Sequence, residues 1–190
     1  VGQSDQAQAA SKNIANISLP EVQWLIVPRH PNRFDEVARL LQDAGLRVAR
    51  RSAWQGDVPV AADVWLGDSM GEMAAYYTLA DVVLLGGSFA PLGGQNLIEA
   101  AACGCPVVVG PHTFNFAEAT ELACEAGAAW RTPGLPAAAD KALALVQHPH
   151  DLEKARAAAT AFAQAHRGAA RATARQVADL LGVAASSAKD

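Results

Sequence analysis

The sequence predicts an α/β fold with a doubly wound parallel sheet, and two features of its apolar pattern support this. First, short continuous apolar runs occur at Trp24–Val27, Val82–Leu85 and Val107–Val109, as expected for strands buried on both faces. Second, the stretches between such runs repeat apolar residues at helical spacing. Because strands that alternate with amphipathic helices imply right-handed crossovers, the strands are expected to run parallel.

The expected elements follow in chain order. We expect strands near residues 23–28, 47–51, 63–66, 82–86, 106–110 and 128–130. Helices are expected over residues 34–44 and 116–126, because Gly45 and Gly127 supply the residue type that commonly ends a helix. The Ala-rich tail from about Pro136 lacks strand signals, so it is expected to form two helices, the later one long.

Length and composition indicate one globular domain. The chain has 190 residues, of which 51% are hydrophobic, so it can bury a core. Residues 1–20 have little apolar periodicity and are interpreted as a flexible lead-in or a cloning remnant, which leaves residues 21–190 as the domain. The opening valine favours a fragment of a longer protein.

Charge and cysteine content exclude several classes of function. The formal net charge is −4 and no long run of Lys or Arg occurs, so we expect no nucleic-acid partner. The three cysteines lack CxxC spacing and are interpreted as small apolar residues in a reducing compartment. No stretch resembles a membrane span or a signal peptide, so the chain as given is expected to be soluble.

Turns after the predicted strands are rich in glycine, proline and polar residues. In an open parallel sheet, ligands bind in the crevice beyond the carboxyl ends of the strands, so these turns are where a site is expected. They are Pro28–Pro31, Gly67–Glu72, Gly86–Ser88, Gly93–Glu99 and Gly110–His112.

The turn Gly93–Glu99 has features of a phosphate site. Its two glycines allow close approach of the backbone, and the helix that follows offers free N–H groups to an anion. Glu99 lies about one turn beyond Asn96, so its carboxylate could accept hydrogen bonds from a ribose diol. Equally, Asn96 and Glu99 fit a capping box with no ligand.

The turn Gly67–Glu72 has two interpretations as well. Asp68 or Ser69 could cap a helix that begins near Gly71, with Glu72 in its first turn. However, a glycine at a helix start costs about 1 kcal/mol relative to alanine, and Met70 is expected to be exposed. Close approach of a ligand would explain both features.

Histidine and arginine side chains also occur at these turns. Arg29 and His30 follow a buried strand between two prolines, and the planar arginine fork suits carboxylate or phosphate. A surface salt bridge is the alternative for Arg29. His112 and Asn115 lie in a similar turn, where a histidine is either a hydrogen-bonded loop residue or a chemical group.

Several common site motifs are missing from the sequence. It contains no HExxH, paired cysteines or Asp-x-Asp that would hold a metal. It also contains no G-x-S-x-G, P-loop lysine or G-x-G-x-x-G. We therefore expect no metal and no cofactor, and the hydrolase, NTPase and dehydrogenase interpretations lose their main support.

Taken together, the five turns, extended through Phe116, resemble the C-terminal domain of bacterial 3-deoxy-D-manno-octulosonic acid (Kdo) transferases in order and spacing. The resemblance covers about Gln23 to Arg131. It implies the B-type glycosyltransferase architecture of two Rossmann-like domains, in which the C-terminal domain holds most of the donor, CMP-Kdo. By this resemblance and by their positions at strand ends, we expect the following residues to bind the donor: Pro28, Arg29, His30, Met70, Gly71, Glu72, Gly87, Ser88, Asn96, Leu97, Ile98 and Glu99.

The resemblance also implies a reaction. Kdo moves from CMP to a hydroxyl of the lipid A precursor (lipid IVA) in lipopolysaccharide core biosynthesis, with inversion and without a metal. The family's base is a glutamate of the N-terminal domain, so we expect no catalytic residue in this chain and no turnover by it alone. The full-length protein is expected at the cytoplasmic face of the inner membrane, with only that form associated with the membrane.

Two departures from the family pattern and two alternatives remain open. Gln95 stands where relatives commonly have histidine, and residues 1–20 show no clear match to the segment expected before Pro28. The first alternative is a B-type transferase domain for another donor, such as a UDP-sugar. The second is a nucleotide-binding domain that does not catalyse.

Overall fold

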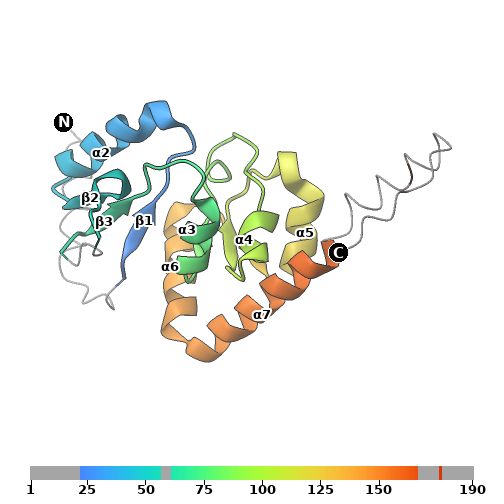
Figure 1. The fold of residues 1–190 in the computed structure, drawn as a ribbon. Helices are drawn as coiled ribbons and strands as arrows, with labels where there is room; N and C mark the ends of the chain where they lie inside the picture. The colour runs from blue at the N-terminus through green and yellow to red at the C-terminus, as the bar shows by residue number, and fades with distance from the viewer. Residues whose placement is uncertain (1–21, 57–60, 167–175, 177–190) are drawn as a thin grey trace, which may run out of the picture. The chain divides into compact units, whose positions relative to one another are not determined.

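The computed structural model of the chain describes residues 22–56, 61–166 and 176 (Figure 1). Its strands are β1 (Trp24–Ile26), β2 (Val48–Arg50), β3 (Val64–Leu66), β4 (Val83–Leu84), β5 (Val107–Val109) and β6 (Ala129–Arg131). Its helices are α2 (Phe34–Asp43), α3 (Met73–Leu79), α4 (Ile98–Ala102), α5 (Ala117–Glu125), α6 (Leu135–Gln147) and α7 (Pro149–His166), with short 3-10 turns at Pro31–Arg33, Arg51–Ala53 and Phe114–Phe116. The predicted lead-in at residues 1–20 lies outside the described residues.

The described residues form two compact units that divide between Met70 and Gly71. The first unit, up to Met70, contains a three-stranded sheet in the order β1-β3-β2, and the second unit, from Gly71, contains one in the order β4-β5-β6. Every pair is parallel, so the α/β class and the six parallel strands are confirmed. The assignment of residues 21–190 to one domain stays a prediction.

Strand β5 is the centre of the second unit. Val107, Val108 and Val109 are all 0% exposed, which is what a continuous β-branched run predicts for a strand covered on both faces. Each buried valine contributes about 1.5 to 3 kcal/mol by leaving water. The helix α6 packs against β4 and β5, and α5 packs against β6.

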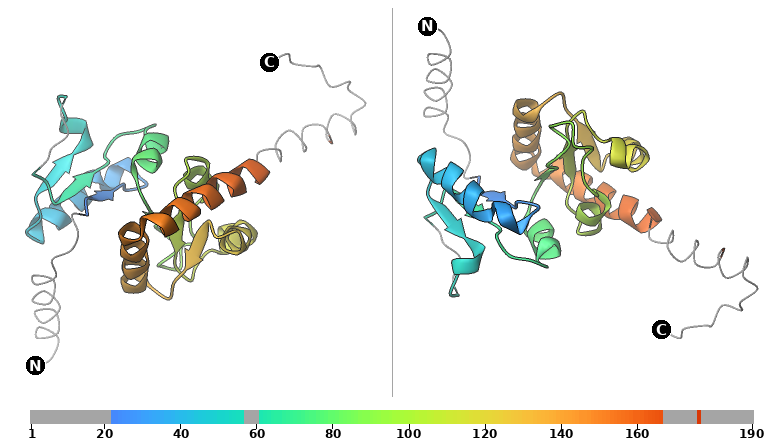
Figure 2. Two further views of the ribbon diagram at one scale, coloured as in Figure 1. Left: turned by 90° about the horizontal axis from the view of Figure 1, so that it is seen from below. Right: turned by 90° about the horizontal axis from the view of Figure 1, so that it is seen from above.

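Alanines bring two helices of the second unit close together. The short helix α4 packs against α7, the long orange helix in Figure 2. Ala100 and Ala101 on α4, with Ala159 and Ala163 on α7, are buried in one cluster, and their small side chains permit close approach. The two predicted C-terminal helices are thus confirmed as α6 and α7. No helix in the described part of the chain combines the length and apolarity that crossing a bilayer requires.

The cysteine thiols are all unpaired, and one of them is part of the core. Cys105 is 0% exposed, and its thiol donates to the carbonyl of Ala80 at 3.5 Å. Burial raises the pKa of Cys105 to about 12, so the thiol stays protonated at neutral pH. This agrees with its interpretation as a small apolar residue.

A buried carboxylate organises the first unit. The side chain of Asp68, 1% exposed, accepts hydrogen bonds from Arg50 Nε at 2.6 Å and from Ser52 N and Oγ at 2.8 and 2.6 Å. Arg50 also pairs with Asp35 of α2 at 2.6 Å. Asp68 therefore links the end of β3 to the end of β2, and the expectation that its side chain caps the next helix is wrong.

Removing the Asp68 charge is expected to destabilise the first unit by about 2 kcal/mol, because Arg50 and Ser52 lose a buried acceptor. Burial opposes ionisation of Asp68, but the bonds from Ser52 and Arg50 outweigh it and lower its pKa below the ordinary 3.8. Because the folded pKa is depressed, this stabilisation is present above pH 3.8 and is lost as the pH falls through the lowered value. Urea unfolding of Asp68→Asn at pH 7 and pH 3 measures both effects. The exposed Asp35→Asn is the matched control, and equal losses in the two variants would contradict the prediction.

Candidate functional site

Three of the predicted turns meet at one rim of the second unit. They follow β4 and β5, whose carboxyl ends lie at the same edge of the parallel sheet. Backbone hydrogen bonds join them: Gly94 N donates to Gly87 O at 3.1 Å, His112 N to Ser88 O at 3.0 Å and Asn115 N to Gly93 O at 3.2 Å. The convergence of these turns is therefore confirmed within this unit.

Ser88 holds this rim together from inside. Its side chain is 0% exposed, and its hydroxyl donates to Leu85 O at 2.5 Å while it accepts from Gly110 N at 2.8 Å. Gly110 has no room for a side chain, because a Cβ there would overlap the Ser88 carbonyl oxygen. The Ser88 hydroxyl is thus committed to the loop, and only the backbone of this turn remains to face a ligand.

The turn at Gly93 is fixed by Asn115. The Asn115 side-chain amide donates to Leu92 O at 3.3 Å, and a Cβ on Gly93 would overlap that amide and the ring of Phe114. Gly93 also has a φ of 85°, a region that favours glycine. Both reasons for this glycine are internal to the fold, so they account for it without a ligand.

Asn96 and Glu99 form a polar pair beyond that turn. Asn96 Oδ1 accepts from Ile98 N at 3.1 Å, and Asn96 Nδ2 donates to Glu99 Oε1 at 3.1 Å. The pair differs from the capping box considered above, because Glu99 bonds the Asn96 side chain rather than the backbone. Glu99 is exposed, whereas Leu97 is 1% exposed and Ile98 packs against the core. Of the predicted residues 96–99, Asn96 and Glu99 therefore have polar side chains at the surface.

The turn before α3 differs from its prediction in where the helix begins and in which residue caps it. The helix begins at Met73 rather than near Gly71, and its N-terminal cap is Glu72, whose carboxylate accepts from the Tyr76 hydroxyl at 3.3 Å. Gly71 precedes the helix with a φ of 79°. This backbone conformation explains the glycine without a ligand. Met70 is 70% exposed, as expected.

In the first unit, the predicted binding residues follow β1. Pro28 is half-buried, and Arg29 and His30 are exposed. The carbonyl of His30 accepts from Arg33 N at 3.0 Å, which starts the short 3-10 turn. Among the residues that the structure describes, none forms an ion pair with Arg29. Among these residues, the salt-bridge alternative for Arg29 therefore has no support.

Arg131 is a residue at this rim that sequence reasoning missed. Its guanidinium donates to Gly110 O at 3.2 Å and to Thr113 Oγ1 at 2.9 Å, and it pairs with Glu121 of α5. It therefore fixes the loop after β5 from the neighbouring strand. The sequence could have indicated Arg131, because an arginine at the carboxyl end of a predicted strand lies at the same rim as the chosen turns.

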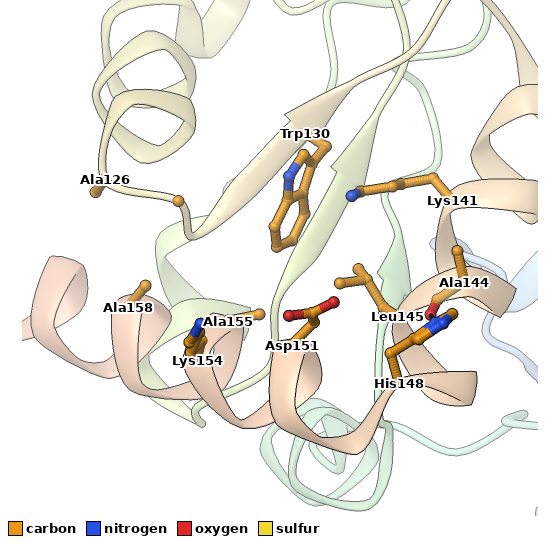
Figure 3. Close-up of a pocket in the computed structure, with 11 residues that line it drawn as sticks. Ala126, Trp130, Lys141, Ala144, Leu145, His148, Asp151, Lys154, Ala155 and Ala158 are labelled. Atoms are coloured by element: carbon orange, nitrogen blue, oxygen red, sulfur yellow. Dashed lines mark hydrogen bonds between the residues drawn. The ribbon is translucent and has the colours of Figure 1, made fainter.

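A shallow pocket of about 540 Å³ in the second unit involves none of the predicted residues (Figure 3). It lies among β6, α6 and α7, with Lys141 Nζ 4.6 Å from the centre of the Trp130 ring. Ala126 and Gly127, which precede β6, line it, so it opens toward the amino end of that strand. Ligands of open parallel sheets bind at the other end, so this pocket is a poor candidate for the site.

Comparisons with known proteins place this geometry in a family. No family model matches the chain. The crystal structure of the C-terminal CMP-Kdo binding domain of WaaA from Acinetobacter baumannii aligns with a TM-score of 0.72 and 34% identity, over 84% of this chain and 80% of that domain. The chain belongs to the Kdo transferase family. The expected relation to the C-terminal domain of a B-type glycosyltransferase is thereby confirmed.

Curated Kdo transferases agree with this assignment. The 3-deoxy-D-manno-octulosonic acid transferase of Bordetella pertussis is 54% identical over 158 residues, which cover 83% of this chain and 37% of that protein. The enzyme of Haemophilus influenzae is 42% identical over 107 residues, 56% of this chain and 25% of that protein. The chain thus matches well under half the length of these relatives.

A metal centre would need clustered ligands. Among residues 22–56, 61–166 and 176, no group of three or more His, Cys, Asp or Glu side chains lies close enough to hold an ion.

Proposed function

We propose that this chain is the CMP-Kdo binding part of a transferase that moves Kdo from CMP-Kdo to the lipid A precursor. One observation carries the proposal: the chain matches 80% of a solved domain that binds CMP-Kdo, at 34% identity. The much higher identity to the Bordetella pertussis transferase supports the same reaction. Lipid IVA as acceptor and the inner membrane as location belong to this proposal.

The proposed donor residues are those chosen from the sequence. In the first unit, the planar guanidinium of the exposed Arg29 suits the phosphate or the Kdo carboxylate. In the second unit, Asn96 holds the exposed Glu99 carboxylate in place, which suits hydrogen bonds from the ribose diol of CMP. The remaining proposed contacts are Pro28, His30, Met70, Gly71, Glu72, Gly87, Ser88, Leu97 and Ile98.

In the proposed reaction, this chain stabilises the leaving group, and the rest of the transferase supplies the base. Departure of CMP develops charge on its phosphate, and backbone N–H groups of the Gly86–Ser88 turn and of the helix start at Asn96 would stabilise that charge. A base must take the proton of the acceptor hydroxyl. We place that base outside this chain, so the chain binds the donor without turning it over.

Calorimetry with CMP and with UDP tests the proposed donor. CMP is expected to bind more tightly to the chain than UDP, because CMP is the nucleotide of the proposed donor. Arg29→Ala is expected to weaken CMP binding about tenfold through loss of a charged hydrogen bond, whereas Arg39→Ala on α2 should leave it unchanged. A clear preference for UDP would favour a UDP-sugar transferase instead. Absence of Kdo transfer by the full-length protein would favour a non-catalytic domain.

A further inference from the structure

The guanidinium of Arg131 holds the loop after β5 at two points. Its Nη1 donates to Gly110 O at 3.2 Å and to Thr113 Oγ1 at 2.9 Å. Its Nη2 pairs with Glu121 of α5. Because a guanidinium is planar and rigid, these bonds fix the first residue of the loop relative to the residue three positions later and relative to α5.

The bond to Thr113 lies inside the protein. Thr113 is 5% exposed, so a hydroxyl that loses its partner there is poorly compensated by water. A lysine in place of Arg131 would keep the positive charge, but its single flexible ammonium group cannot reproduce the planar fork. The contact therefore depends on the shape of arginine and not only on its charge.

The loop that Arg131 holds also carries two of the turns proposed to bind the donor. His112 N donates to Ser88 O at 3.0 Å, and Asn115 N donates to Gly93 O at 3.2 Å. The first bond reaches the turn after β4, and the second reaches the turn before α4. A shift of the loop would thus displace both turns, and all of these contacts lie within the second unit.

We propose that Arg131 is a positioning residue of the donor site, which holds the turns Gly86–Ser88 and Gly93–Glu99 in the arrangement that binds CMP-Kdo. This inference rests on the proposed function. Arg131 acts through the loop after β5, because its hydrogen bonds go to that loop and to α5. It is additional to the donor contacts proposed from the sequence.

Steady-state kinetics of the full-length transferase with Arg131→Lys tests the inference. The KM for CMP-Kdo is expected to rise about tenfold through misplacement of the turns. The kcat should change less than about twofold, because a loss of uniform binding raises KM alone. A merely structural role would instead lower the unfolding midpoint and the amount of active enzyme, and it would leave the KM for CMP-Kdo unchanged.

Arg156→Lys is the matched control. The guanidinium of Arg156 donates to Ala80 O at 3.4 Å and pairs with Asp81 at 2.6 Å, so it too joins a backbone carbonyl and a carboxylate. Its side chain is 31% exposed, and that of Arg131 is 33% exposed. Its acceptors precede β4 and therefore lie at the amino end of that strand. Arg156→Lys should leave the KM for CMP-Kdo unchanged, even where it lowers the unfolding midpoint.

A double-mutant cycle with Thr113→Val tests the contact itself. Thr113→Val removes the hydroxyl that Arg131 bonds and is expected to raise the KM for CMP-Kdo about threefold. Because the two residues act through one contact, the double variant should have about the same KM as Arg131→Lys alone. Two effects that multiply would show that the residues act independently and would overturn the inference.

Calorimetry of the full-length transferase with CMP separates this inference from the proposed function. If the parent protein binds CMP and Arg131→Lys binds it equally well, Arg131 does not position the donor turns, although the proposed donor stands. If the parent protein does not bind CMP, both proposals fail. Equal increases in KM for Arg131→Lys and Arg156→Lys would also overturn the inference, because the cause would then be general destabilisation.

Discussion

The substitution Gly110→Ala is expected to lower the free energy of unfolding of the second unit by about 3 kcal/mol, through overpacking at a backbone contact. The added Cβ would overlap the carbonyl oxygen of Ser88 and lie 2.8 Å from Cδ1 of Phe89. The Ser88 backbone cannot move away cheaply, because its carbonyl accepts from His112 N and its hydroxyl accepts from Gly110 N.

Urea unfolding followed by circular dichroism measures this loss. Gly134→Ala is the matched control: the nearest atom to a Cβ there is 3.9 Å away, and the φ of 179° is extended backbone. That variant should stay within about 0.5 kcal/mol of the parent. If Gly110→Ala were as stable as Gly134→Ala, the packing of the rim described above would be wrong.

Glu99→Ala in the full-length transferase is expected to reduce kcat/KM for CMP-Kdo about 30-fold, the loss of one charged hydrogen-bond acceptor worth about 2 kcal/mol. Glu99 is exposed and is not part of the core, so the fold should survive the change. Glu99→Gln keeps an oxygen that accepts from Asn96 Nδ2 but removes the charge. If Glu99→Gln lowers kcat/KM less than Glu99→Ala does, the difference measures the contribution of the hydrogen bond to Asn96, and the remaining loss measures that of the charge.

Steady-state kinetics of Kdo transfer at varied CMP-Kdo concentration measures these effects. Glu118→Ala removes an exposed carboxylate from the first turn of α5 and should leave kcat/KM unchanged. Normal transfer by Glu99→Ala would remove Glu99 from the donor site, although membership of the Kdo transferase family would stand.

Local sequence pattern correctly predicts a strand or a helix where the apolar residues of that segment alone determine which side chains are buried. The valine run 107–109 forms a central strand because no polar side chain interrupts it. Gly45 and Gly127 follow α2 and α5 with φ angles of 82° and 73°, as expected for residues that end helices. The division of the strands into two sheets was not predicted, because strand pairing depends on contacts between distant parts of the chain.

The site was predictable at the level of turns but not of individual side chains. Three turns follow strands β4 and β5, and this position in the sequence was enough to predict that they meet in the second unit. However, the partners of Asp68 lie 16 and 18 residues away in Ser52 and Arg50, so a local capping pattern could not reveal them. Likewise, no spacing rule distinguishes Leu97, which is buried, from Asn96, which has a polar side chain at the rim.

The central claim is that this chain binds CMP through residues at the turns proposed from its sequence, and a CMP titration followed by amide NMR of the 190-residue chain tests it most directly. We predict that the amides of Arg29, Glu72 and Asn96 shift together and saturate at the same CMP concentration, while Trp130, in the pocket toward the amino end of β6, does not respond. Shifts confined to the Trp130 and Lys141 pocket, or to only one of the three predicted positions, would contradict the account.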